Sequence, residues 1–93
     1  MSNKKFTSVW DAIENTPEET ENMKLRSALM MALKSHISRS GLSQAEAAKR
    51  LGVTQPRVSD LVRGKINLFG LDVLVNMAAA AGMRVEMRLR KAA

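Results

Sequence analysis

The 93-residue sequence contains no cysteine, no tyrosine, two phenylalanines, one tryptophan and a single histidine. Without cysteine the chain can form neither a disulfide nor a thiolate metal site, which fits a reducing cytoplasm. The only histidine, His36, lies within an apolar helical pattern and has no clustered carboxylate pair near it, so the usual acid–base and nucleophilic sites cannot be assembled. A buried, hydrogen-bonded histidine is the expected role. We therefore expect no enzymatic activity, no metal and no cofactor.

Long apolar runs are also missing from the sequence. There is no signal-peptide core and no run long enough to span a membrane, so we expect a cytoplasmic protein. The length suits one small domain, whose hydrophobic core is marginal unless a second copy adds to it.

The charge is strongly uneven along the chain. The net charge is +6, but residues 1–22 hold two lysines against five acidic residues and carry −3, which leaves +9 for the remainder. A basic body indicates an anionic partner, with nucleic acid the first candidate, and the acidic leader is suited to a basic partner.

Start and stop signals divide most of the chain into helices. Caps such as Thr16, followed by Pro17, mark helix starts. After Pro17 the chain carries no glycine or proline until Gly41, which marks the end of this helix. The pattern predicts an all-α fold in the main, a compact bundle of about five helices, at residues 9–13, 17–41, 43–51, 54–64 and 71–82.

The longest of these predicted helices carries an apolar stripe at helical spacing. Such spacing is typical of a helix that packs on a core. Met30 and Met31 widen the stripe, and we expect these methionines to fill the core and not to form a surface for a partner. The stripe consists of Leu25, Ala28, Leu29, Ala32, Leu33, His36 and Ile37.

The last segment changes from helical spacing to strict alternation of apolar and charged residues, which predicts a half-buried β-strand. No second clear strand exists, so its backbone groups need a partner, and the same strand of a second subunit is the favoured one. Pairing with residues 6–10 is less favoured, because Ser8 and Asp11 indicate a helix there. The expected dimerisation residues are Met83, Val85, Met87 and Leu89.

Residues 42–65 show the pattern of two short helices joined by a tight turn. Ser43 and Glu46 are spaced as a capping box for the first helix. Gly52 supplies the left-handed residue that ends it, and Thr54 stands at the cap of the second helix, with Pro56 tolerated in its first turn.

This stretch resembles the Xre family of helix-turn-helix DNA-binding domains. One departure is Ala47, where the family usually places a larger aliphatic residue. The matching features are Leu42-Ser43-Gln44, Ala45, Ala48, Leu51-Gly52-Val53, Thr54-Gln55, Val58, Leu61 and Arg63-Gly64-Lys65, with Leu71, Leu74 and Ala80-Ala81-Gly82 following.

The resemblance implies that the second helix of the motif enters the DNA major groove. Gln55 is the first candidate for a base contact, since glutamine can pair with adenine, while Arg57 or Arg63 could contact guanine or a phosphate. Asp60 could accept from cytosine or orient one of these arginines. The expected DNA-binding residues are Gln44, Thr54, Gln55, Pro56, Arg57, Ser59, Asp60, Arg63 and Lys65.

A finer resemblance is to small HigA-like antitoxins, carried by Thr16-Pro17-Glu18-Glu19, the 55–61 run and the terminal Arg-Val-Glu-Met-Arg segment. It implies an autorepressing dimer, a palindromic operator and a RelE-like ribonuclease toxin as partner. The alternatives are a stand-alone Xre regulator and a pure dimeric interaction module. The expected divisions are 1–22 (acidic leader), 23–82 (DNA-binding domain) and 83–93 (dimerisation strand and tail).

For such a toxin the leader would supply both charge and apolar anchors. The alternative is that Trp10 and Ile13 only cap the small core while the acidic groups stay in water. The residues expected at a toxin interface are Trp10, Asp11, Ile13, Glu14 and Glu18.

Overall fold

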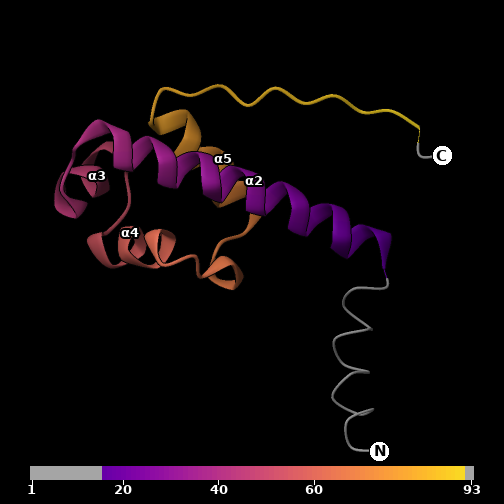
Figure 1. Ribbon diagram of the computed structural model, residues 1–93, viewed down its shortest axis with the longest axis horizontal. Coiled ribbons are helices and arrows are strands. Elements are labelled where there is room, and N and C mark those ends of the chain that lie inside the picture. Colours follow the sequence, from indigo (N-terminus) through magenta and orange to yellow (C-terminus); the bar gives the residue numbers. More distant parts are fainter. Residues whose placement is uncertain (1–15, 92–93) are drawn as a thin grey trace, which may run out of the picture.

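The computed structural model describes residues 16–91 of the chain, and they fold as a small helical domain. Figure 1 shows one long helix with the shorter helices gathered along the part nearer its C-terminal end. The described residues form α2 (Pro17–Ser40), α3 (Gln44–Leu51), α4 (Gln55–Val62), the 3₁₀ helix η1 (Ile66–Leu68) and α5 (Leu71–Ala80). The mainly helical prediction is confirmed with four α-helices in this part of the chain. The predicted helix at 9–13 lies outside the described residues.

The start and end of α2 follow from the predicted signals. The Thr16 hydroxyl accepts a hydrogen bond from the Glu19 backbone N–H at 3.2 Å, and Pro17 takes the first helical position, where no backbone donor is needed. Gly41 ends the helix in the left-handed region at φ 71°. The helix runs unbroken past residue 22, the boundary expected between leader and domain.

The capping box that begins α3 is also present as predicted. The Ser43 hydroxyl accepts from the Glu46 backbone N–H at 3.1 Å, and the Glu46 carboxylate accepts from the Ser43 backbone N–H at 2.9 Å. The hydrogen bond from the Ser43 backbone N–H to the carboxylate is the main cause that holds the pKa of Glu46 below its ordinary value, and the Ser43 hydroxyl lowers that pKa further. The charged carboxylate therefore stabilises the helix start, and this contribution is lost as the pH falls through the lowered pKa.

The hydrophobic core lies where the shorter helices meet the C-terminal half of α2. α2 packs against α4, η1 and α5, while α3 packs against α4 and α5. The residues with the least exposure come from every α-helix and from the loop before α5: Met30, Leu33, Ile37, Ala47, Ala48, Leu51, Val58, Leu61, Phe69, Leu74, Met77 and Ala78.

The apolar stripe predicted on α2 is buried only in part. Leu33 and Ile37 lie in the core, but Leu25 is 39% exposed, and Ala28 and Ala32 are exposed as well. The prediction fails because the shorter helices do not cover the side of α2 that carries Leu25, Ala28 and Ala32, and the N-terminal turns of α2 extend past them (Figure 1). The apolar side chains there remain without a full cover in the described chain.

His36 and the paired methionines also differ from expectation. His36 is half-buried, and its imidazole makes no hydrogen bond with any described residue. Met30 is buried, but Met31 is 68% exposed, because consecutive helical positions point about 100° apart and only one of the two can face the core.

The C-terminal segment is extended but forms no β-strand among the described residues, so the predicted strand is wrong for the isolated chain. Its last backbone hydrogen bond runs from the Met83 N–H to the Ala78 carbonyl at 2.9 Å. The physical reason is that a strand needs a hydrogen-bonding ladder, and residues 16–82 offer no extended neighbour. In Figure 1 the segment runs back along α2 toward the N-terminal end of that helix.

Two arginines from different helices hold the loop that contains η1. The Arg57 Nη1 donates to the Leu68 carbonyl at 3.0 Å, and its guanidinium lies 4.6 Å from the centre of the buried Phe69 ring. The Arg26 Nη1 donates to the Ile66 carbonyl at 3.4 Å. Arg57 therefore links α4 to the loop that follows it, and we call this contact the Arg57 brace.

Removing this brace should lower the stability of the domain. We expect Arg57→Ala to reduce the free energy of unfolding by about 1 kcal/mol, because it removes a charge-assisted hydrogen bond and a cation–π contact at a partly exposed site. Thermal and urea unfolding followed by circular dichroism measure this change. Arg63→Ala, which removes an exposed arginine one residue past the same helix, is the control and should unfold like the original chain. Equal stability of all three proteins would contradict the brace.

Candidate nucleic-acid interface

The two sides of α4 differ sharply in burial. Val58 and Leu61 are completely buried, and Val62 packs against the same core. Gln55 and Pro56 are exposed on the first turn of the helix. The core therefore fixes the helix while leaving its first turn and outer side open to a partner.

The N-terminal end of α4 presents polar groups that have no partner among residues 16–91. Thr54 occupies the N-cap position, as predicted, but its hydroxyl makes no capping hydrogen bond. At the opposite end of α4, the side chain of the C-cap residue Arg63 is exposed and makes no hydrogen bond or ion pair in that range. The Gln55 side chain, in the first turn of the helix, is likewise exposed and makes no hydrogen bond there. Free donors at a helix N-terminus, where the helix dipole is positive, are suited to an anion such as a phosphate.

Asp60, whose role the sequence left open, has a defined partner. Its carboxylate Oδ1 lies 3.6 Å from the Lys65 Nζ, and the side chains are 27% and 48% exposed, respectively. The Asp60 carbonyl also accepts the Lys65 backbone N–H at 3.0 Å, because Gly64 turns the chain back at φ 75°. Asp60 thus pairs with Lys65 and not with Arg57 or Arg63, and each group reduces the charge that the other offers to DNA.

Arg57 and Ser59 are less accessible than the sequence suggested. Both side chains are half-buried, and Arg57 is held by its brace to Leu68 and Phe69. Its guanidinium has five N–H donors, so donors remain after the bond to Leu68. No sequence signal indicated the brace, because it joins an outward-facing helix position to a loop carbonyl whose direction depends on the tertiary fold.

Gln44 lies in the first turn of α3, next to the Ser43 cap, and is exposed. The motif thus presents the N-terminal turns of two helices, each with an exposed glutamine at its first position. The exposed residues of the predicted DNA-binding set are Gln44, Thr54, Gln55, Pro56, Arg63 and Lys65.

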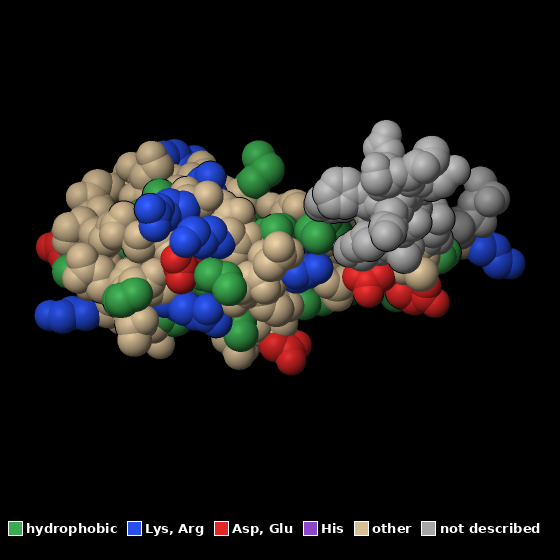
Figure 2. Space-filling model, turned by 90° about the horizontal axis from the view of Figure 1, so that it is seen from below, with side chains coloured by type: hydrophobic (Ala, Val, Ile, Leu, Met, Phe, Trp, Pro, Cys, Tyr) green, Lys and Arg blue, Asp and Glu red, His purple; other side chains and the backbone are tan. Residues whose placement is uncertain are grey.

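The face that carries α4 is also rich in cations. Figure 2 views this face and shows Lys and Arg side chains gathered around an acidic group at the end of the molecule that holds the shorter helices. Three of the described acidic side chains lie away from this group: Glu18, Glu19 and Glu21 are exposed in the first turns of α2. The separation directs the positive charge toward the same surface as the open side of α4.

The other expected sites are only partly placed. Trp10, Asp11, Ile13 and Glu14 lie outside the described residues, so of the predicted toxin interface only Glu18 can be located, in the first turn of α2. Among the predicted dimerisation residues, Met83 packs against the core, and exposure rises along the segment from 40% at Val85 through 63% at Met87 to 87% at Leu89.

Residues 16–91 contain no group of three or more His, Cys, Asp or Glu side chains that could hold a metal ion. No helix in that range is long and apolar enough to cross a membrane.

Comparison with known proteins agrees with this geometry. Residues 12–90 match the family model described as a helix-turn-helix domain. A solved structure named "Putative XRE Family Transcriptional Regulator" is similar over 80% of this chain and 83% of its own, with 38% sequence identity and a TM-score of 0.72. A search of curated proteins gave no match. The chain therefore belongs to the Xre family of helix-turn-helix DNA-binding transcriptional regulators.

Proposed function

We propose that this protein is a sequence-specific repressor that reads its operator with the open side of α4. The observation that carries the proposal is the burial pattern of this helix: Val58 and Leu61 are fully buried, while Gln55 and Arg63 are exposed and unpaired among the described residues. A helix held in this way can enter the major groove, which is wide enough to admit it.

Within this proposal the residues divide into those that read bases and those that hold the backbone. Gln55, with a free amide, pairs with adenine, and Arg63 holds guanine or a phosphate. Thr54 and Gln44, at the starts of α4 and α3, bind phosphates together with the helix N-terminal amides. The remaining members, which flank these contacts, are Pro56, Arg57, Ser59, Asp60 and Lys65.

The repressor acts as a homodimer on a palindromic operator, with Met83, Val85, Met87 and Leu89 forming the contact between subunits. The support is the exposed apolar side of the C-terminal segment. Two copies related by a two-fold axis should bind half-sites about 34 Å apart, which is one turn of DNA, or a multiple of that distance.

We further propose that the repressor is an antitoxin that controls its own operon and neutralises a RelE-like ribonuclease. The support is the net charge of −3 on residues 1–22 against +9 on the remainder, because a protein that binds RNA is basic and complements an acidic leader. A stand-alone Xre regulator remains the second candidate, and its gene would have no such neighbour.

The base contact can be tested on the DNA upstream of the gene. Gln55→Ala should reduce discrimination at one base pair in each half-site by about 1–3 kcal/mol, measured by competition with single-base-pair variants of the operator. A pure interaction module would give no specific shift with this DNA, and an unchanged preference in Gln55→Ala would contradict the assignment of Gln55.

The phosphate contacts have a different signature. If Arg63 holds a phosphate, Arg63→Ala should weaken binding to all sequences and reduce the slope of log K against log salt by about 0.9 for each subunit. The control is Lys24→Ala, which removes an exposed cation paired with Glu21 near the start of α2, away from α4. An equal change in slope for both variants would show that only net charge matters.

The antitoxin role predicts a specific partner. The product of the adjacent gene should be a short basic ribonuclease that co-purifies with this chain, and Glu18→Lys should weaken that complex while leaving the DNA shift unchanged. Absence of such a neighbour, or a complex that Glu18→Lys does not affect, would favour the stand-alone regulator or another toxin surface.

A further inference from the structure

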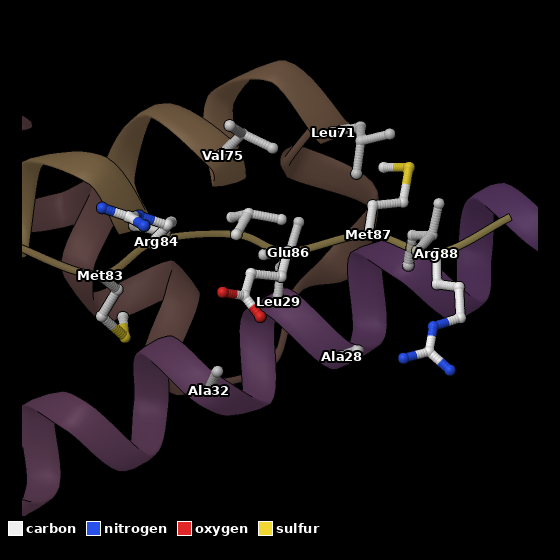
Figure 3. A pocket seen from close by; sticks show the side chains of 13 residues that line it. Ala28, Leu29, Ala32, Leu71, Val75, Met83, Arg84, Glu86, Met87 and Arg88 are labelled. Atoms are coloured by element: carbon white, nitrogen blue, oxygen red, sulfur yellow. The ribbon is translucent and has the colours of Figure 1, made fainter.

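An apolar groove lies between α2, α5 and the C-terminal segment, on a surface that α4 does not line. Its volume is about 370 Å³. Figure 3 shows Ala28, Leu29 and Ala32 on its α2 side and Leu71 and Val75 on its α5 side, with the C-terminal segment lying across it. This is the part of the predicted apolar stripe that the core leaves uncovered.

The segment across the groove also has an unused backbone. From Arg84 to Lys91 no backbone group hydrogen-bonds to another described residue, although the chain is extended. An extended segment with free N–H and C=O groups is a template for pairing with another extended segment. The groove and the segment therefore need a partner that supplies both apolar side chains and backbone hydrogen bonds.

We infer that the partner is the same segment of a second copy, paired antiparallel with Met87 on the two-fold axis. The inference rests on the dimer of the proposed function and specifies its interface. Directly opposite residues share a face of an antiparallel pair, so pairing must keep apolar opposite apolar and charged opposite charged. With Met87 opposite Met87, every apolar residue within 84–90 faces an apolar residue of the second copy, and every charged residue faces a charged one. This register also gives each residue from 83 to 91 a facing residue in the second copy.

The charges of the segment favour this register at its centre. It places Glu86 opposite Arg88 of the second copy, twice by symmetry, and opposite charges on facing positions stabilise a pair of strands. Arg84 then faces Arg90, which is a like-charge pair near each end. A Val85-centred register instead places Glu86 opposite Arg84 and pairs only residues 83–87 of the segment.

The same register covers the most exposed apolar side chain. Leu89, at 87% exposure, comes to lie opposite Val85 of the second copy, and Val85 lines the groove. Each copy thus contributes Leu89 to the surface beside the other copy's groove. Burial of this side chain on both copies supplies a hydrophobic driving force that the isolated chain lacks.

Two substitutions that each replace an arginine by a glutamate test the register, because they should affect the dimer dissociation constant differently. Arg88→Glu places a second carboxylate opposite Glu86 and should raise the dimer dissociation constant roughly tenfold. Arg84→Glu makes the same change of charge but places a carboxylate opposite Arg90, so its dimer should be as tight as the original or tighter. The double variant Glu86→Arg/Arg88→Glu restores the central pair and should recover dimerisation. Sedimentation equilibrium of the full chain without DNA measures all four proteins.

Each result decides for or against the inference. Equal weakening by Arg88→Glu and Arg84→Glu, or weakening by Arg84→Glu alone, would overturn the Met87-centred register. A chain that stays monomeric at every concentration would mean that residues 1–15 or a different protein covers the groove, and would overturn the second copy. The sedimentation experiment contains no DNA, so it tests the interface separately from DNA binding. A chain that dimerises as expected but gives no specific shift with the upstream DNA would contradict the proposed function and would not contradict this interface.

The apolar part of the interface has its own matched pair. Leu89→Gln should weaken the dimer roughly tenfold, because two buried leucines are lost. Met31→Gln, which changes a 68% exposed side chain on α2 that does not line the groove, should leave it unchanged. Both positions are exposed in the single chain, so helical circular dichroism should show both variants folded. Equal dimerisation of the two variants would contradict the role of Leu89.

Discussion

The burial of Val58 and Leu61 is the interaction on which the DNA-binding surface depends. Both side chains are fully buried where α4 packs against α2 and α3, and they fix the rotation of α4 about its own axis. An eight-residue helix has little stability of its own, so its direction is set by this packing. The same constraint keeps Gln55 and Arg63 on the open surface, and the Arg57 brace ties the loop after the helix to the core.

The longest helix contributes to two different parts of the molecule. In α2, Leu33 and Ile37 are buried in the core, whereas Leu25, Ala28 and Ala32 line the groove. A domain of this size buries a modest core, and added burial through a second copy is a common way to strengthen one. An interface on α2 and the C-terminal segment would leave α4 free, so dimer formation and DNA binding need not compete for the same surface.

Much of the fold could be predicted from local sequence signals. The caps at Thr16 and Ser43 and the glycines that end the helices identify elements through chemistry within a few residues, and the family resemblance orders the motif. The sequence overestimates how much of the apolar stripe on α2 is buried, because periodicity shows which residues share a face and not how far the neighbouring helices extend. The C-terminal alternation predicted a strand, but a strand depends on a partner that one chain does not contain.

The sequence indicates which residues of the DNA-binding site face outward, but not which side chains of the site contact one another. Gln55 and Arg63 are exposed as expected, because α4 has one apolar side and the other must face outward. The ion pair of Asp60 with Lys65 and the contact of Arg57 with Phe69 depend on where the turn at Gly64 directs the chain. Such pairings join residues that no helical or strand period relates, and only the tertiary structure reveals them.

The central claim is that the open side of α4 lies against the bases of the operator. Because the chain has no cysteine, a single thiol can be placed at will and carry a short photo-crosslinker. On the upstream DNA, Ser59→Cys in α4 should crosslink to bases within both half-sites, while Met31→Cys on the exposed side of α2 should not crosslink. Crosslinking from Met31→Cys, or none from Ser59→Cys in a complex that still forms, would contradict the account.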